Sequence, residues 1–333
     1  MAGVRLRGRD QSEAPGDADI TNEALLEVRG LKVGFPTPDG LVRASDTVDL
    51  EIYPRETLGL IGETGSGKTV LGMAILRLLQ PNAVIEGEIR YRDHDLLTLP
   101  EDEMRKVRGR EIGIVLQNSG TSLNPVYTVG TQIAEAVTLH QGLSGHDARQ
   151  RAVELLDAVG IPDPVRMAGE YPHRFSGGMR ERALIATALA CRPTLLIADE
   201  PTKGLDAVTK RGIVDLFSEI DRDRSVLFIT HDIETVEDLA ARVAVMYAGE
   251  IVEVGGVREV FGDPAHPYTR GLLASLPERG MRPIPGSAPS LITLPPGCRF
   301  SPRCGCAIGG CNREHPGLVE VGPGHYARCM LYD

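Results

Sequence analysis

The alternation of apolar and polar residues predicts strands in the first part of the chain. Two segments alternate with period 2, and prolines and a glycine between them predict a turn. A short, continuous apolar run follows, which predicts a buried strand, and beyond a glycine-rich stretch lies an apolar segment of helical length. The predicted strands are residues 25–33, 46–52 and 57–61, the turn holds Pro36, Pro38 and Gly40, and the helix covers residues 70–79.

Further along, short apolar runs alternate with segments of helical pattern. Strands are predicted at residues 85–91, 112–116, 195–198 and 226–230, and helices at 101–107, 148–159 and 179–190. Strands that alternate with helices favour a mainly parallel α/β sheet. A helical insertion, at about residues 118–165, interrupts it.

The composition changes after about residue 276. Six prolines fall within twenty residues, at positions 277, 283, 285, 289, 295 and 296. This density predicts a linker or an irregular appended domain, and not a continuation of the sheet. We therefore expect a disordered tail at residues 1–22, a main domain at 23–262 and a C-terminal extension at 263–333.

Charge and targeting signals narrow the choice of partners. The 333 residues include 36 Lys and Arg against 46 Asp and Glu, which gives a net charge of −10. Such a chain would repel nucleic acid and anionic lipid, so any phosphate has to be captured locally. No apolar run is long enough to span a bilayer, and the N-terminus lacks the apolar region of a signal peptide. We expect a cytoplasmic protein.

The glycine-rich stretch fits the phosphate-binding pattern GxxxxGK[ST]. It reads Gly62-Glu63-Thr64-Gly65-Ser66-Gly67-Lys68-Thr69 and lies between a predicted strand and a predicted helix, as the pattern requires. Glycines such as Gly62, Gly65 and Gly67 let backbone N–H groups, Ser66 included, turn toward phosphates. Lys68 would reach the β- and γ-phosphates, and Thr69 offers a hydroxyl to Mg²⁺. A chance glycine-rich turn is the alternative, and the strand and helix context argues against it.

Further segments, in their order along the chain, resemble those of ABC ATPases. IGIVLQ (112–117) resembles the strand before the Q-loop, FSGGMR (175–180) the signature motif, and LLIADE (195–200) the Walker B strand. GLD (204–206) resembles the D-loop, and VLFITH ends in a switch histidine. Each piece alone has a structural explanation, but their joint order after a P-loop makes chance very improbable.

The resemblance implies a role for each matching residue. Gln117 and Asp199 would join Thr69 around Mg²⁺, Glu200 would be the general base, and His231 would contact the γ-phosphate. Residues of the signature motif would bind ATP held by a second subunit, at a helix N-terminus that Ser176 caps. These are Ser176, Gly177 and Gly178, with Asp206 of the D-loop at the same interface and Phe35 as a candidate to stack on adenine.

The family implies the fold as well: a P-loop ABC ATPase with a mixed sheet core, an antiparallel β subdomain and a helical subdomain at about residues 118–190. To this we add a small, irregular, Cys-rich C-terminal domain. TSLNP (121–125), YPHRFSGGMRER (171–182) and HPYT (266–269) resemble the ATPases of oligopeptide and dipeptide permeases, a group that also handles nickel chelates and opines. Asn118, Ser119 and Lys203 depart from the pattern of this group, and Lys203 is expected to face solvent.

Five of the six cysteines lie in the last 36 residues of the chain. Cys298, Cys304, Cys311 and Cys329 supply four thiols, which suit a [4Fe–4S] cluster or structural Zn²⁺. Similar permease ATPases are thought to hold iron–sulfur there, so we favour iron, with Cys306 as a spare thiol. Free cysteines in a mobile tail are the alternative.

Together these features predict an ATP-hydrolysing subunit of an importer for peptides or similar small solutes. The expected partners are two transmembrane permease subunits, a second ABC ATPase subunit and, indirectly, an extracytoplasmic solute-binding protein, at the cytoplasmic face of the membrane. Nucleic acid is not expected. Two alternatives are a soluble ABC ATPase of DNA repair or translation and a regulatory ATPase that senses iron or oxidants. The chain has neither the long coiled-coil insertion nor the second cassette usual in the first, and Glu200 and His231 argue against pure sensing.

Overall fold

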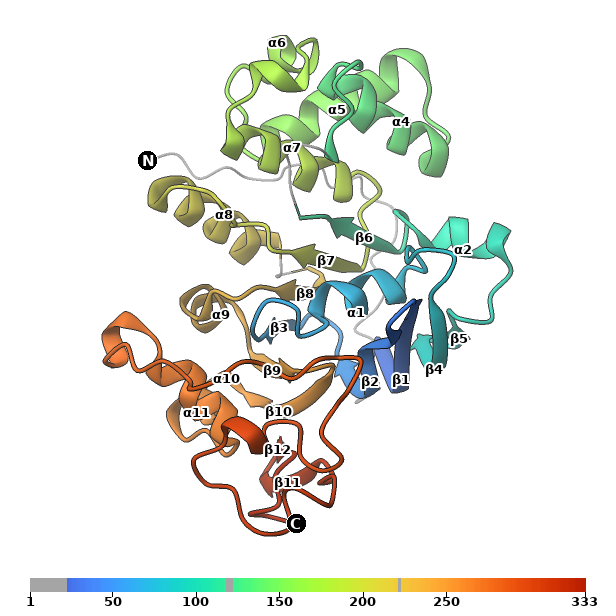
Figure 1. Cartoon of the computed structure of the whole chain (residues 1–333). Coiled ribbons are helices and arrows are strands. Elements are labelled where there is room, and N and C mark those ends of the chain that lie inside the picture. Colours follow the sequence, from blue (N-terminus) through green and yellow to red (C-terminus); the bar gives the residue numbers. More distant parts are fainter. Residues whose placement is uncertain (1–22, 118–121, 221–222) are drawn as a thin grey trace.

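A computed structural model describes residues 23–117, 122–220 and 223–333 of the chain. The predicted tail at residues 1–22 lies outside the described residues, as do Asn118, Ser119 and Thr121. The helices and strands that follow are placed in Figure 1.

The larger of two sheets forms the centre of the molecule (Figure 1). Its eight strands have the order β11-β12-β10-β9-β3-β8-β7-β6. Neighbours from β9 to β6 pair in parallel, and β11, β12, β10 and β9 pair antiparallel. The strands are β3 (Thr57–Ile61), β6 (Ile112–Val115), β7 (Leu195–Asp199), β8 (Ser225–Ile229), β9 (Arg242–Tyr247), β10 (Glu250–Gly256), β11 (Val319–Gly322) and β12 (His325–Ala327).

A second, antiparallel sheet has four strands in the order β2-β1-β4-β5. They are β1 (Leu26–Thr37), β2 (Gly40–Ile52), β4 (Val84–Tyr91) and β5 (His94–Asp95). The predicted antiparallel β subdomain is thus confirmed. Of the residues predicted in the turn, however, Pro36 lies in β1 and Gly40 is the first residue of β2. Position 36 tolerates proline because β1 pairs with β4 only as far as Gly34, so no ladder hydrogen bond is required from residue 36 on that edge.

Helices cover the large sheet and form a separate layer beyond its β6 edge (Figure 1). The layer holds α4 (Val129–Gln141), α5 (Gly145–Ala158), α6 (Pro164–Ala168) and α7 (Gly177–Ala188), which matches the predicted helical subdomain. The other helices are α1 (Lys68–Ile75), α2 (Glu101–Val107), α8 (Ala207–Ile220), α9 (Ile233–Leu239), α10 (Val257–Gly262) and α11 (Pro267–Ala274), and 3₁₀ turns lie at Pro172–Arg174, Pro277–Arg279 and Ser301–Arg303. Helix α1 is shorter than predicted because the chain leaves helical geometry at Arg77, whose φ is 52°.

The core lies on both faces of the large sheet. In β7, Leu195 and Ile197 pack into one apolar cluster, and Leu196 and Ala198 pack into the other. Successive side chains of a strand point to opposite faces, so a strand buried on both faces becomes a continuous apolar run. This explains why the parallel strands were predicted from apolar runs and not from alternation.

The C-terminal extension corrects one prediction, since it does continue the sheet. Strand β12 pairs antiparallel with β10 through Glu253↔Ala327 and Val254↔Tyr326, and β11 pairs with β12. The physical reason is that β10 would otherwise expose an unpaired edge of N–H and C=O groups. Between the 3₁₀ turn at Pro277–Arg279 and residue 300, the proline-rich segment has no helix or strand, as predicted. Within the described residues, no helix has the length and apolar character needed to cross a membrane.

Candidate active site

The predicted phosphate loop lies between β3 and α1. Gly62 and Gly67 have φ values of 152° and 109°, in the region where side chains are strained. A Cβ at Gly62 would overlap the Met246 carbonyl oxygen, and one at Gly67 would overlap that of Ala44. Only glycine fits at either position, so the loop can curl and its N–H groups, with the N-terminus of α1, can face an anion.

Lys68 is the first residue of α1 and is buried, with 6% of its surface exposed. Its Nζ donates to the carbonyl oxygens of Gly62 (2.8 Å) and Glu63 (2.9 Å) and to Ser66 Oγ (3.4 Å). Burial lowers the pKa of the ammonium, and the carboxylates of Glu200, Asp199 and Glu63 oppose that shift. The loop therefore fixes a cation beside the backbone that would hold phosphates.

Asp199 ends β7 and fits the role of a Mg²⁺ ligand with Thr69. The carboxyl group is 3% exposed, and its Oδ1 has no hydrogen-bond partner among the described residues. Burial raises the pKa of Asp199, and a side-chain hydrogen bond from Thr69 opposes this shift. A buried carboxylate oxygen without a partner is unfavourable unless a cation or water satisfies it. Oxygen ligands from one carboxylate and one hydroxyl, with substrate phosphates, suit Mg²⁺.

Glu200 and His231 form a pair next to Asp199. His231 Nδ1 lies 2.9 Å from Glu200 Oε1 and 2.8 Å from Oε2, and the Thr230 hydroxyl donates to Oε2 at 3.4 Å. The Glu200 side chain is 9% exposed and that of His231 56%. Glu200 has a left-handed φ of 52°, a sparsely populated conformation held by a hydrogen bond from its N–H to the Ile229 carbonyl. A carboxylate oriented in this way can accept a proton from water.

Strand order explains why residues far apart in sequence meet here. The phosphate loop, His231 and Glu200 follow β3, β8 and β7, which are consecutive in the sheet. Gln117 follows β6, the next strand; because Val115 pairs with Ala198, Gln117 lies at the level of Glu200. Gln117 is half-buried. These residues lie at the carboxyl edge of parallel strands, where α/β sheets bind ligands.

Comparisons with known proteins agree with this geometry. The family described as "ABC transporter" matches residues 45–203, and "Oligopeptide/dipeptide transporter, C-terminal region" matches residues 252–311. A protein of Brucella melitensis biotype 1 named "Putative peptide import ATP-binding protein" is 45% identical, over 94% of this chain and 98% of the relative. A protein of the same description from Brucella abortus is 46% identical, over 92% and 94%. The chain belongs to the ABC transporter family.

Solved structures support the same assignment. The ATP-binding cassette MJ0796, in a dimeric post-hydrolysis state bound to ADP and Pi, is 28% identical with a TM-score of 0.64. The match covers 70% of this chain and 99% of that cassette. A second dimeric structure of MJ0796 gives a TM-score of 0.63. The predicted fold is confirmed, and the chain is an ATPase of the ABC type.

The segment that resembles the ABC signature motif lies at the start of helix α7. Ser176 is the N-cap, and its Oγ accepts a hydrogen bond from Met179 N at 3.3 Å. Gly177 and Gly178 form the first turn, where a Cβ at Gly178 would overlap the Thr209 methyl group. Figure 1 shows α7 with the helical layer and α1 with the core, so the motif and the phosphate loop belong to different layers of the chain.

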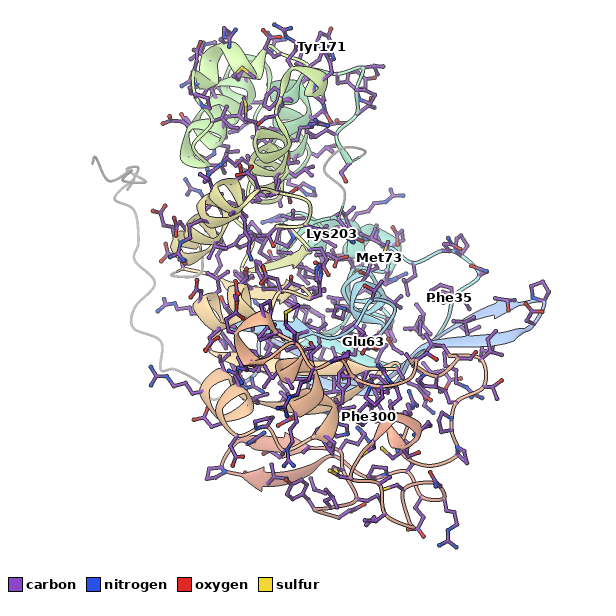
Figure 2. The ribbon with its side chains drawn as sticks, turned by 60° about the vertical axis from the view of Figure 1, so that its left-hand side comes forward. Phe35, Glu63, Met73, Tyr171, Lys203 and Phe300 are labelled. Atoms are coloured by element: carbon purple, nitrogen blue, oxygen red, sulfur yellow. The ribbon has the colours of Figure 1, made fainter. Side chains whose placement is uncertain are left out.

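The segment that resembles the D-loop lies between β7 and α8. Asp206 Oδ1 accepts hydrogen bonds from Val208 N (3.1 Å) and Thr209 N (3.0 Å), and Thr209 Oγ1 donates to Oδ2 (2.6 Å). These bonds, chiefly that from the Thr209 hydroxyl, lower the pKa of Asp206. Lys203 is exposed, as predicted, and its N–H donates to the Glu200 carbonyl. Figure 2 shows Lys203 between the helical layer and α1, which carries Met73.

Phe35 lies on β1, opposite Val42 of β2, and is half-buried against the core. Figure 2 shows it to the side of α1, away from Tyr171 in the helical layer. Its stacking on adenine stays a prediction, since a partly buried aromatic on a hairpin fits a packing role equally well.

The cysteines of the extension gather in one region but do not form a ligand set. Cys298, Cys311 and Cys329 are buried, Cys304 is half-buried and Cys306 is exposed. Cys298 N donates to the Cys311 carbonyl, and burial raises the pKa of the Cys298 thiol to about 11. Among the described residues, no three Cys, His, Asp or Glu side chains converge as metal ligands. The side chains as placed therefore do not fit the predicted metal.

Two residues next to the phosphate loop were not predicted as part of the site. The Tyr268 hydroxyl accepts a hydrogen bond from Glu63 N at 2.9 Å, and Arg303 forms an ion pair with the Glu63 carboxylate. The HPYT motif marked Tyr268 only as a subfamily feature. Nothing in the sequence relates Arg303 to a loop 240 residues earlier.

Proposed function

We propose that this chain is the ATP-hydrolysing subunit of an importer for peptides or similar small solutes, such as nickel chelates or opines. The observation that carries the proposal is the combination of an intact ATPase site with a C-terminal region of the oligopeptide/dipeptide type. The relatives of 45% and 46% identity are named for peptide import, and the match to them spans almost their whole length.

The residues present support hydrolysis as well as ATP binding. Lys68 and the loop N–H groups bind the phosphates, and Thr69, Asp199 and Gln117 would hold Mg²⁺, which neutralises charge on the phosphate oxygens. Glu200 accepts a proton from the attacking water, and His231 keeps its carboxylate in place at 2.8–2.9 Å. Replacing Glu200 with Gln keeps the shape and removes the base.

We expect Glu200→Gln to bind Mg-ATP with unchanged affinity and to lose turnover, by a factor of about 100 or more. The measurements are equilibrium ATP binding and phosphate release by the purified chain. Glu219→Gln, on α8 and away from the site, is the matched control and keeps full turnover. Normal phosphate release from Glu200→Gln would remove Glu200 from the role of general base.

We further propose that two subunits form composite sites, in which Ser176, Gly177, Gly178 and Asp206 of one subunit meet ATP on the phosphate loop of the other. The placement of the signature motif in a different layer from the phosphate loop supports an action between subunits (Figure 1). The solved structures of MJ0796 are dimeric, and one holds ADP and Pi. A second, different ABC ATPase is the partner that the subfamily favours.

The permease contact is proposed on the helical layer, at the cytoplasmic face of the membrane. A groove of about 470 Å³ lies between α4 and α5, lined by Tyr127, Leu139 and Arg149 among others. Val126, Tyr127 and Leu139 are 69%, 54% and 73% exposed. A concentration of exposed large apolar side chains beside a groove is typical of an interaction site. Two transmembrane permease subunits fit it, and a solute-binding protein would act through them.

A mild detergent pull-down of the tagged chain from native membranes tests the importer. Recovery of two permease proteins and a second ATPase supports it, whereas ribosomal or DNA-bound partners overturn it. Leu139→Glu is expected to lose the permeases and keep ATP binding. Met281→Glu is the matched control, because Met281 is similarly exposed (68%) and lies in the proline-rich segment.

We also propose that Cys298, Cys304, Cys311 and Cys329 bind a metal, as a [4Fe–4S] cluster or, alternatively, Zn²⁺. Because these thiols do not converge in the structure described above, binding would have to draw their side chains together. Its support is the number and spacing of the thiols in the sequence, with three of them buried. The test is anaerobic purification followed by iron and zinc analysis and a visible spectrum. Bound iron with a broad absorption band supports the cluster, zinc supports the alternative, and a chain with neither metal overturns both.

A further inference from the structure

The second residue of the phosphate loop is an acid that the C-terminal extension neutralises. The Glu63 carboxylate receives two hydrogen bonds from Arg303, from Nη1 to Oε2 at 3.0 Å and from Nη2 to Oε1 at 3.1 Å. This is the bidentate geometry of the strongest ion pairs between arginine and carboxylate. The Arg303 side chain is 6% exposed and that of Glu63 30%, so the pair is partly shielded from solvent.

Arg303 is held in this position by groups other than Glu63. Its Nε donates to the Pro285 carbonyl at 3.0 Å, and Nη1 also donates to the Tyr247 hydroxyl at 3.3 Å. The guanidinium lies over the rings of Tyr247 (5.7 Å) and Phe300 (6.0 Å). An arginine fixed by stacking and by a backbone carbonyl loses little freedom when it binds a carboxylate. Figure 2 shows Glu63 and Phe300 on the same side of the molecule.

The main chain of Glu63 links the same extension to the catalytic lysine. Glu63 N donates to the hydroxyl of Tyr268, the buried tyrosine of α11, and its carbonyl accepts from Lys68 Nζ at 2.9 Å. Tyr268 packs against Tyr247 and Phe300, with ring centroids 4.5 Å and 5.5 Å away. One aromatic cluster, formed by Tyr247, Tyr268 and Phe300, therefore supports both Arg303 and the loop.

A carboxylate in this loop is unfavourable for a site that binds a polyanion. Glu63 lies next to the phosphate-binding lysine, since Lys68 Nζ donates to the Glu63 carbonyl oxygen at 2.9 Å. A negative charge on Glu63 would repel the phosphates of ATP, more strongly in a partly buried site than in water. A cation paired with Glu63 removes most of that repulsion.

Resting on the proposed ATPase function, we propose that Arg303 is a positioning residue for ATP binding. It neutralises the Glu63 carboxylate and holds it away from the phosphates, so that the Cys-rich extension sets the ATP affinity of the catalytic domain. The role requires Glu63: without the acid, the loop has no charge for Arg303 to neutralise.

The requirement for Glu63 makes a double-mutant cycle decisive. In the full-length chain with Glu200→Gln, so that ATP persists, equilibrium binding of Mg-ATP is measured for Arg303→Gln, Glu63→Gln and the pair. We expect Arg303→Gln to raise Kd about tenfold, the effect of losing one charge-assisted interaction. Glu63→Gln removes the charge that Arg303 neutralises, so in that background Arg303→Gln has less than about a twofold effect on Kd. The matched control is Arg313→Gln, which keeps the starting Kd: Arg313 is an exposed arginine of the same extension, and among the described residues its side chain donates only to the Gly309 carbonyl.

A structural role for Arg303, through Pro285 and Tyr247 alone, predicts the same loss with or without Glu63, and that result overturns the proposal. An unchanged Kd in Arg303→Gln also overturns it. If Arg303→Gln does not fold, Arg303→Lys, which keeps the charge, replaces it in the same cycle; a loss that persists in the Glu63→Gln background again overturns the proposal. A starting chain that binds no ATP refutes the proposed ATPase function itself, a result distinct from all of these.

Discussion

His266 makes the C-terminal extension sensitive to acid. It is 1% exposed and is the N-cap of α11, where its Nδ1 accepts a hydrogen bond from Tyr268 N at 3.0 Å. Burial lowers the pKa of His266 to about 3, helped by the charge of Arg270, while a hydrogen bond to the Arg328 backbone opposes the shift. Because Nδ1 has to accept from an N–H group, the folded protein needs the neutral ring. Protonation would break the cap of the helix that carries Tyr268.

The size and sign of the effect follow from the two pKa values. An unfolded histidine has its ordinary pKa of about 6.5, so below that pH the unfolded chain binds a proton that the folded chain excludes. The contribution of neutral His266 to the free energy of unfolding is therefore at its full value above about pH 6.5 and falls as the pH drops toward 3. Each pH unit costs about 1.4 kcal/mol, so the loss between pH 7 and pH 5 is about 2 kcal/mol.

Urea unfolding at pH 7 and pH 5 measures this loss when the starting chain is compared with His266→Asn. Asparagine keeps an acceptor for Tyr268 N, as a good N-cap does, and does not titrate. Other titrating groups act alike in the two proteins, and the smaller side chain acts alike at the two pH values, so the difference between the two losses isolates His266. We expect His266→Asn to lose about 2 kcal/mol less than the starting chain. Equal losses in the two proteins would refute the assigned protonation state.

Substitutions at three further positions, Gly178, Ser176 and Lys203, each test one local feature of the structure. Gly178→Ala is expected to lower the free energy of unfolding by about 1–3 kcal/mol because its Cβ overlaps the Thr209 methyl group. Thr209→Ser removes that methyl group and keeps the hydroxyl that bonds to Asp206, so it should restore most of the lost stability. Thermal unfolding measures both changes. Ser176→Ala should cost about 1 kcal/mol of stability through loss of the α7 cap and should abolish ATP turnover by the dimer, whereas normal turnover would contradict its role in the composite site. Lys203→Thr should change the free energy of unfolding by less than about 0.5 kcal/mol, since the side chain is exposed, and a larger change would indicate a partner within the chain.

The local sequence pattern predicted the elements whose burial and whose end points are both determined by neighbouring residues. Strand β3 has the predicted bounds, Thr57–Ile61, because five buried and mostly apolar residues stand between a polar turn and the glycine-rich loop. Helix α2 has the predicted bounds as well, with acids in its first turn and basic residues in its last. By contrast, β9 and β10 were not assigned, and β11 and β12 were placed in an irregular domain. Their pairing depends on an edge that only the folded sheet provides.

Candidate catalytic residues could be named from the sequence because their motifs are contiguous and their order is distinctive. The structure adds what the motifs do not contain, such as the bond between His231 and Glu200 and the unpartnered oxygen of Asp199. Arg303 could not have been assigned to the site, because the chain has 46 acidic residues with which it could form an ion pair. Its pairing with Glu63 depends on stacking against Tyr247 and Phe300. Long-range pairs of this kind follow from tertiary packing and leave no local signal.

The sequence of β10 nevertheless contains one indication that the extension packs against this strand. Glu250 and Glu253 lie in an otherwise apolar strand and are 2% and 0% exposed. Buried carboxylates are strongly unfavourable unless they are paired. Their partners come from beyond residue 262: Arg299 (3.3 Å) and His315 (2.7 Å) for Glu250, and His325 (2.7 Å) with the N–H groups of Ala265 and His266 for Glu253. A glutamate in a strand that is otherwise buried therefore indicates that a basic segment covers it. By this argument the extension and the catalytic domain share one core, and the extension can influence the phosphate loop because the sheet beneath that loop is incomplete without it.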